Sequence, residues 1–287
     1  MKKDLLSEIE VGMNGFSKAQ KTLASYILGH YDRAAYLTAS KLGQAAGISE
    51  STVVRFATEL GYEGYPEMQK ELQKIIRSRL TSVQRVEITD ALIGEGDVLD
   101  RVLNSDADKI INTLAEIDKK AFAAAVDKIV SAKRIFIIGV RSSSALAGFL
   151  NFNLRMIFDN ISFVQTTSGS EMFEQIMSMS SDDVLIAISF PRYSSRIINA
   201  VEYANAAGAD VISITDGIQS PIAPLADQLL IARSDMVSYI DSLVAPLSII
   251  NAIIVAVARK KPDEVKSRLE KLETIWDAYD VYDKKKA

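Results

Sequence analysis

The sequence predicts an all-α helix-turn-helix domain at the N-terminus, joined to an α/β domain with a five-stranded parallel sheet flanked by helices. The chain has 287 residues, 48% of them hydrophobic, which is enough for two hydrophobic cores. Residues 47–56 read GISESTVVRF, which has a turn glycine followed by a helix with one polar face. From residue 134 onward, short β-rich runs alternate with helical patterns, as in parallel sheets.

The first helices are predicted from their capping signals. Ser17 and Gln20 have the spacing of a capping box, so a helix is expected to begin at Ser17. A short helix is expected over residues 38–46, with Leu42 facing inward and Lys41 left polar. Gly47 can take the positive φ angle that a sharp turn requires, and Ser49 can cap the helix that follows.

The helix after this turn has two different faces. Val53, Phe56, Ala57 and Leu60 recur at three- and four-residue steps and form the apolar face. In two helices joined by a short turn, the second helix can enter the major groove of DNA. An ordinary pair of antiparallel helices in an enzyme is the alternative. We predict DNA contacts from Lys41, Ser49, Glu50, Ser51, Thr52 and Arg55. Arg55 is expected to be the chief contact.

Gly61 is expected to cap the end of that helix, and after a second break at Gly64–Pro66 a helix with an apolar stripe is expected over residues 66–80. Residues 42–67 read LGQAAGISESTVVRFATELGYEGYPE. This stretch resembles the N-terminal domain of the RpiR/MurR family of bacterial regulators. The resemblance implies operator DNA as a partner. Residues 1–80 carry 11 Lys and Arg against 9 Asp and Glu, whereas the remainder carries 22 against 28, so only the N-terminal part is net basic.

Composition argues against several other functions. The chain has no Cys and one His, His30, which argues against a metal site or a cofactor held by such ligands, and we predict neither. Its charged start, MKKDLLSEIE, does not resemble a secretory signal, so a cytoplasmic location is expected. The apolar run 243–258 is too short for a membrane span and predicts a helix buried by the sheet or by another subunit.

Residues 81–96 lack a strong pattern and contain Gly94 and Gly96, so we predict a linker between a domain at 1–80 and one at 97–287. A helix with an apolar pattern is expected over 97–117, and another over 119–130 with Asp118 as its cap. The predicted strands are 134–139, 162–165, 183–189, 210–215 and 228–231.

Ligands of parallel sheets bind beyond the carboxyl ends of the strands, and two loops at such ends are rich in hydroxyls. Either loop alone is more often a helix cap than an anion site, but two at equivalent positions favour an anion site. Arg192 adds a guanidinium, which binds phosphate or carboxylate with two hydrogen bonds. We predict effector contacts from Arg141, Ser142, Ser143, Ser189, Arg192, Ser194 and Ser195.

Residues 120–260 resemble the SIS (sugar isomerase) domain, the phosphosugar-binding module of RpiR/MurR regulators. The resemblance implies a phosphosugar or sugar-acid effector. Its usual first loop, G-x-G-x-S, keeps Gly139 and Ser143 here but has Arg141 in place of the second glycine. Its usual second loop, S-x-S-G-x-[ST], keeps the outer serines but has Pro191 and Arg192 in the centre. The phosphate pocket is therefore expected to be altered.

The sequence favours a ligand-responsive transcriptional regulator that acts as a homodimer or homotetramer, without a membrane partner and without enzymatic activity. The alternative is a sugar-phosphate isomerase with an accessory helical domain, in which Glu171 or Glu202 would be the base. A purely structural protein would leave the polar helix face and the two anion loops without a purpose.

Overall fold

A computed structural model of the chain describes residues 5–77, 81, 83–86, 97–165, 168–236 and 239–282. The chain divides into two compact units, which we describe separately. The first comprises Met1–Val102 together with Met236–Asp241, and the second comprises Leu103–Asp235 together with Ser242–Ala287. Gly94 and Gly96 of the predicted linker lie outside the described residues, and the domain boundaries predicted from the sequence stay a prediction.

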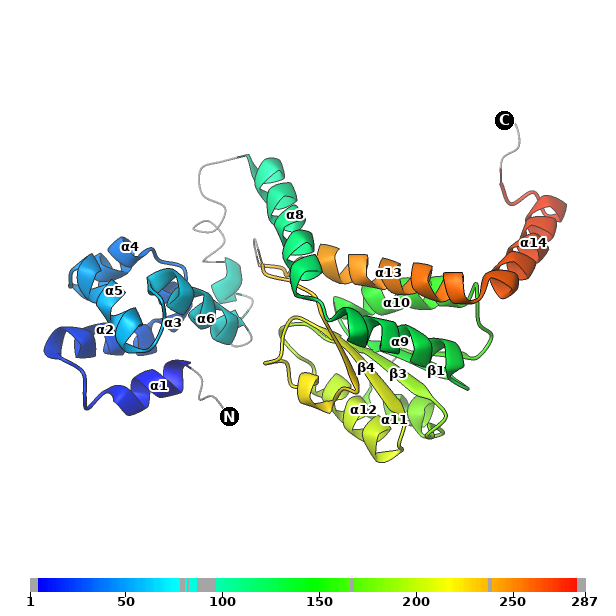
Figure 1. The fold of residues 1–287 in the computed structure, drawn as a ribbon, viewed down its shortest axis with the longest axis horizontal. Coiled ribbons are helices and arrows are strands. Elements are labelled where there is room, and N and C mark those ends of the chain that lie inside the picture. Colours follow the sequence, from blue (N-terminus) through cyan, green and yellow to red (C-terminus); the bar gives the residue numbers. More distant parts are fainter. Residues whose placement is uncertain are drawn as a thin grey trace. The chain divides into compact units, whose positions relative to one another are not determined.

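The first unit is a cluster of helices around one core (Figure 1). Its described helices are α1 Leu5–Gly12, α2 Lys18–Gly29, α3 Tyr31–Ala34, α4 Ala39–Ala46, α5 Glu50–Glu59 and α6 Tyr65–Arg77. Leu23, Leu42 and Phe56 are fully buried there. Met236 packs against the same core, although it comes from the segment that follows the last strand of the sheet. In this unit Arg85 also donates to Asp241 at 3.1 Å, and both side chains are buried.

The predicted capping signals are confirmed. The Ser17 hydroxyl accepts from the Gln20 N–H, and the Gln20 side chain accepts from the Ser17 N–H, so both halves of the capping box are present. Thr38 caps α4 and Ser49 caps α5. Gly47, between them, has a φ angle of 69°, the left-handed conformation that the turn requires. Local hydrogen bonds therefore determine where the helices of the motif begin and end.

The second unit has a parallel sheet with helices on both faces (Figure 1). Its strands are β1 Ile135–Gly139, β2 Ile161–Val164, β3 Val184–Ile188, β4 Asp210–Thr215 and β5 Gln228–Ile231, in the order β2-β1-β3-β4-β5. Its helices are α8 Val98–Glu116, which begins in the first unit, α9 Lys119–Ser131, α10 Ser143–Leu154, α11 Gly169–Ile176, α12 Ser195–Ala206, α13 Val244–Lys260, α14 Pro262–Ala278 and the short η1 Ala223–Leu225. The predicted five-stranded parallel sheet is confirmed.

Alternate residues of the strands face two separate cores. Ile135 and Ile137 of β1 pack with α9, α10 and α13, whereas Phe136 and Ile138 pack with α11 and α12. Both faces are therefore buried, which explains why the strands read as continuous apolar runs rather than alternating ones. One face of α13, including Ile249, Ile250 and Ile253, is buried in the first of these cores. No helix among the described residues is long and apolar enough to cross a membrane.

The helix expected over 97–117 forms as α8, but its apolar pattern does not identify its buried face. Lys109 and Thr113 are the residues of α8 that are buried. Lys109 donates to Ser105, and the Thr113 hydroxyl accepts from the Arg233 N–H at 2.9 Å. The exposed large apolar residues of α8 include Leu99, Leu103, Ile110, Ile111 and Leu114. Hydrogen bonds to the segment after β5 have thus turned the polar side of α8 inward.

An ion pair with a fully buried carboxylate lies at the amino ends of β1 and β3. Arg134 donates from Nε to Oδ1 of Asp183 at 3.1 Å and from Nη2 to Oδ2 at 2.6 Å. The Ser180 N–H and hydroxyl also donate to Oδ2, at 2.8 and 3.0 Å. Burial alone would raise the pKa of Asp183, but the hydrogen bonds from Arg134 and Ser180 outweigh it and hold this pKa below its usual value.

Candidate DNA-binding face and effector site

Helix α5 has the two faces that the sequence predicts. Val53, Phe56 and Ala57 are fully buried, whereas Glu50 and Ser51 are exposed. The exposed Lys41 lies on the preceding helix, α4. The buried side of α5 therefore anchors the helix, and its opposite side is open to a partner.

Hydroxyl groups surround the N-terminus of α5. The Ser49 hydroxyl accepts from the Thr52 N–H at 3.3 Å and lies 3.0 Å from the Ser51 hydroxyl and 2.8 Å from the Thr52 hydroxyl. Arg55 is exposed, and its Nε donates to the Ser51 carbonyl at 3.3 Å. Among the described residues, its two terminal nitrogens have no protein partner. They are available to phosphate or to the O6 and N7 acceptors of guanine.

The structure adds neighbours that the sequence analysis did not assign to this surface. Val54 lies beside Arg55 with 40% of its surface exposed, and an exposed apolar side chain there suits the methyl group of thymine. Helix α2, which contacts both α4 and α5, has an open hollow lined by Lys18, Lys21, Thr22 and Ser25. Their spacing of three and four residues places these four side chains on one face of the helix, so this surface could have been predicted from the sequence. Lysine and hydroxyl side chains are typical phosphate contacts.

Gly43 fixes how closely the two helices of the motif approach each other. A Cβ atom on Gly43 would lie 2.9 Å from the Ile48 carbonyl oxygen and 3.2 Å from the Glu50 N. Both atoms belong to the backbone, so they cannot move aside as a side chain would. The sequence analysis missed this role, because close approach of two backbones depends on the tertiary structure.

We expect Gly43→Ala to destabilise the first unit by about 1–3 kcal/mol and to weaken DNA binding, because the added methyl group must push α5 away from α4. Thermal unfolding and DNA binding of the full chain measure this. Gly29→Ala is the matched control, since nothing lies within 4 Å of a Cβ atom at that helix end. Equal stability of the two variants would show that the turn adapts to the extra methyl group.

The two hydroxyl-rich loops lie next to each other at the carboxyl edge of the sheet. β1 and β3 are neighbours, and Gly139 at the end of β1 is paired with Ile188 at the end of β3. Helix α10 begins at Ser143 and α12 begins at Ser195, so each loop leads from a strand into a helix, as predicted. Helix N-termini attract anions, so both loops contribute to the same electropositive edge.

The predicted effector residues differ in accessibility. Ser143 and Ser189 are buried, Ser194 is half-buried, and Arg141, Ser142, Arg192 and Ser195 are exposed. The Ser194 hydroxyl accepts from the Arg196 N–H at 3.3 Å, so it also acts as a helix cap. Arg141 has a φ angle of 56°, and the Ser144 hydroxyl donates to its carbonyl at 2.6 Å. The prediction that Ser143, Ser189, Arg192 and Ser194 line one pocket stays a prediction.

The second loop is tied to the end of β4. The Thr215 hydroxyl donates to the Ser189 carbonyl at 2.7 Å, and the Tyr193 hydroxyl donates to Asp216 at 2.8 Å. The sequence analysis did not include these residues in the site, because their partners are more than 20 positions away in the chain. These bonds position the loop that contains Arg192.

Known proteins share both parts of the chain. Residues 3–79 match the model of the helix-turn-helix domain of the rpiR family, and residues 128–256 match that of the SIS domain. The chain thus has the two domains of a transcriptional regulator of this class, a helix-turn-helix domain and a SIS domain. It belongs to the RpiR family of HTH-type transcriptional regulators.

Similar proteins include an uncharacterised HTH-type transcriptional regulator of Caldanaerobacter subterraneus, 25% identical over 93% of this chain and 95% of that protein. HexR of Pseudomonas aeruginosa, an HTH-type transcriptional regulator, is 26% identical over 77% of this chain and 76% of its own. Among solved structures, Vibrio vulnificus NanR in complex with ManNAc-6P has a TM-score of 0.60 at 23% identity and covers 96% of this chain and 98% of its own.

Proposed function

We propose that this protein regulates transcription by binding operator DNA through α4 and α5 and a sugar phosphate or related sugar-derived anion through the SIS domain. The observation that carries this proposal is the exposed polar face of α5, with its Ser49 cap and the available terminal nitrogens of Arg55. A protein with this role works where the DNA is, so we place it in the cytoplasm.

The effector site that we propose is the carboxyl edge of β1 and β3. Arg192 would pair with a phosphate or carboxylate group of the ligand, while Ser143, Ser189 and Ser194 would orient it. The complex of NanR with ManNAc-6P supports a phosphosugar as the effector of a protein with this fold. A thermal-shift screen of sugar phosphates and sugar acids tests the proposal, because a ligand that binds only the folded state raises the apparent stability.

We propose that the protein is not an enzyme. Glu171 lies in the first turn of α11 and Glu202 in the second half of α12, and both side chains are exposed. An isomerase needs its base within hydrogen-bonding reach of the sugar carbon that loses a proton. Turnover of sugar phosphates by the purified protein would overturn this part of the proposal.

A single helix the length of α5 buries too little surface to specify an operator alone, so we propose that a homodimer or homotetramer binds a pseudo-palindromic site. Duplexes selected by the protein from a random library would then contain two inverted half-sites. A selected site without such symmetry would count against dimeric binding.

Replacing Arg55 by Ala should weaken binding to the selected operator by about 1–3 kcal/mol while the fold stays intact, because one base or phosphate contact is lost. Binding is measured at matched salt concentration, since phosphate contacts depend on ionic strength. Arg33→Ala on α3 is the matched control, because it removes the same charge from a helix that contacts α2 and α6. If Arg55→Ala bound like the parent, the assignment of the reading face would be wrong.

A further inference from the structure

Helix α14 has an apolar stripe that is only partly covered. Val265, Leu269, Leu272 and Trp276 follow each other at steps of four, three and four residues, which is the spacing of a coiled-coil seam. No residue of α14 is buried, and Leu269 keeps 41% of its surface exposed. Such a stripe is suited to a second helix lying along it.

Polar contacts of Arg268 tie α14 to the segment that follows α10. Arg268 Nη2 lies 2.6 Å from Asp159, and Nη1 donates to the Arg155 carbonyl at 2.9 Å. The hydrogen bond from Arg268 lowers the pKa of Asp159. The helix continues from the end of α13 and extends beyond the sheet (Figure 1). Leu269 of the stripe stays open to solvent.

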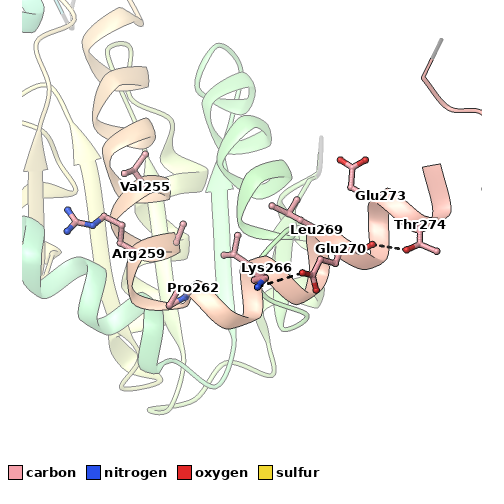
Figure 2. Close-up of a pocket in the computed structure, with 10 residues that line it drawn as sticks. Val255, Arg259, Pro262, Lys266, Leu269, Glu270, Glu273 and Thr274 are labelled. Carbon is pink, nitrogen blue, oxygen red and sulfur yellow. Dashed lines mark hydrogen bonds and ion pairs between the residues drawn. The ribbon is translucent and has the colours of Figure 1, made fainter. Parts of the chain in front are cut away.

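Val265 and Leu269 of this stripe line one wall of a groove whose other wall is the end of α13. Figure 2 shows Val255 and Pro262 along the groove, with Leu269 on the α14 side. Ala258 and Val265 complete the apolar floor. Val255 keeps 59% of its surface exposed, although it belongs to a helix whose other face is packed on the sheet. The groove thus leaves apolar side chains of both helices open to a partner.

The two ends of the groove carry charges of opposite sign, so the grooves of two copies related by a two-fold axis complement each other. Arg259 lies at the α13 end and Glu273 farther along α14 (Figure 2), and neither makes an ion pair with any residue that the structure describes. Lys266 and Glu270 lie between them, 3.9 Å apart. A two-fold axis across the groove would bring the cationic end of one chain to the acidic end of another, as an isologous interface requires.

We propose that a second copy of this chain occupies the groove, with the two α14 helices antiparallel and Arg259 of each copy facing Glu273 of the other. The proposal deepens the assembly in the proposed function, since it names the surface through which two DNA-binding units are held together. The apolar side chains of the groove contribute the attraction, and the two symmetric charge pairs set the orientation.

Charge reversal in the full chain tests this interface. Arg259→Glu and Glu273→Arg should each weaken the dimer by about 10-fold or more, because every change acts twice across a two-fold axis. The double variant Arg259→Glu/Glu273→Arg should recover the parent's affinity, since the pairs are restored with exchanged signs. Sedimentation analysis at micromolar concentration, without DNA, measures the dimer constant, and circular dichroism confirms the fold of each variant.

Two further variants make the result decisive. Leu269→Glu should leave the protein monomeric, whereas Met177→Glu, which changes a still more exposed apolar residue after α11, should not alter the dimer. A monomeric parent, or single variants that dimerise like the parent, would overturn the proposal. So would loss of the dimer only in Leu114→Glu, which would place the interface on α8. Operator binding by the parent is measured separately. A dimer that does not use the groove and a protein that does not bind operator DNA therefore give different results.

Discussion

Replacing Asp183 by Ala should lower the free energy of unfolding of the second unit by about 1–3 kcal/mol, the cost of leaving buried hydrogen-bond donors without their acceptor. The Asp183 side chain is fully buried and accepts from Arg134 and from two Ser180 donors. Its loss leaves the Ser180 N–H without this acceptor and removes one of the links between the amino ends of β1 and β3. Chemical unfolding at pH 7 measures the change.

The neighbouring Asp182→Ala is the control, because Asp182 is 67% exposed and its ion pair with Lys133, at 3.7 Å, should contribute at most about 1 kcal/mol. The pKa of Asp183 lies below its usual value, so its charge stabilises the fold fully above the unfolded-state pKa of about 4. This contribution is lost as the pH falls through the lower, folded-state pKa. The stability difference between the parent and Asp183→Asn should therefore shrink below pH 4, and a constant difference would show that charge is not the cause.

Replacing Arg192 by Ala should weaken effector binding about 10- to 150-fold, since a charge-assisted contact with two hydrogen bonds contributes roughly 1.5–3 kcal/mol. Pro191 offers neither a hydroxyl nor an N–H. The guanidinium of Arg192, which follows it, is therefore the strongest hydrogen-bond donor to an anion in this loop. Calorimetry with the ligand found in the thermal-shift screen gives the affinity. Operator binding without ligand should stay close to that of the parent.

Lys133→Ala is the control for Arg192→Ala, because it removes one positive charge at the opposite, amino-terminal edge of the sheet. Its effector affinity should match that of the parent. The competing explanation is that Arg192 pairs with an acidic side chain at a subunit contact. Unchanged effector affinity of Arg192→Ala together with an altered oligomeric state would favour that explanation and remove Arg192 from the pocket.

The features that the sequence predicted depend on neighbours within one turn or one strand. The capping box at Ser17, the cap at Ser49 and the positive φ angle of Gly47 each involve residues at most three positions apart. The strands were predictable because both faces of the sheet are covered, which leaves uninterrupted apolar runs such as Ile135–Gly139.

The features that the sequence did not predict depend on contacts between distant segments. The inward polar side of α8 follows from the bond between Thr113 and the Arg233 N–H, 120 positions away. The attachment of the second loop to Asp216 through Tyr193 spans 23 positions. For the effector residues, hydropathy and spacing identified the loops, but the same serines also suit helix caps, as Ser194 shows. Local sequence patterns therefore identify candidate effector residues, but they do not distinguish ligand binding from helix capping.

The segment Met236–Asp241 has a consequence for the order in which the protein can be completed during synthesis. Met236 packs in the core of the first unit and Asp241 pairs there with Arg85, yet both residues follow β5 in the chain. A ribosome must therefore translate the whole sheet of the SIS domain before the DNA-binding unit can form its last contacts. A chain released early would lack these contacts, so the completed DNA-binding unit arises only in a chain that also contains the sheet.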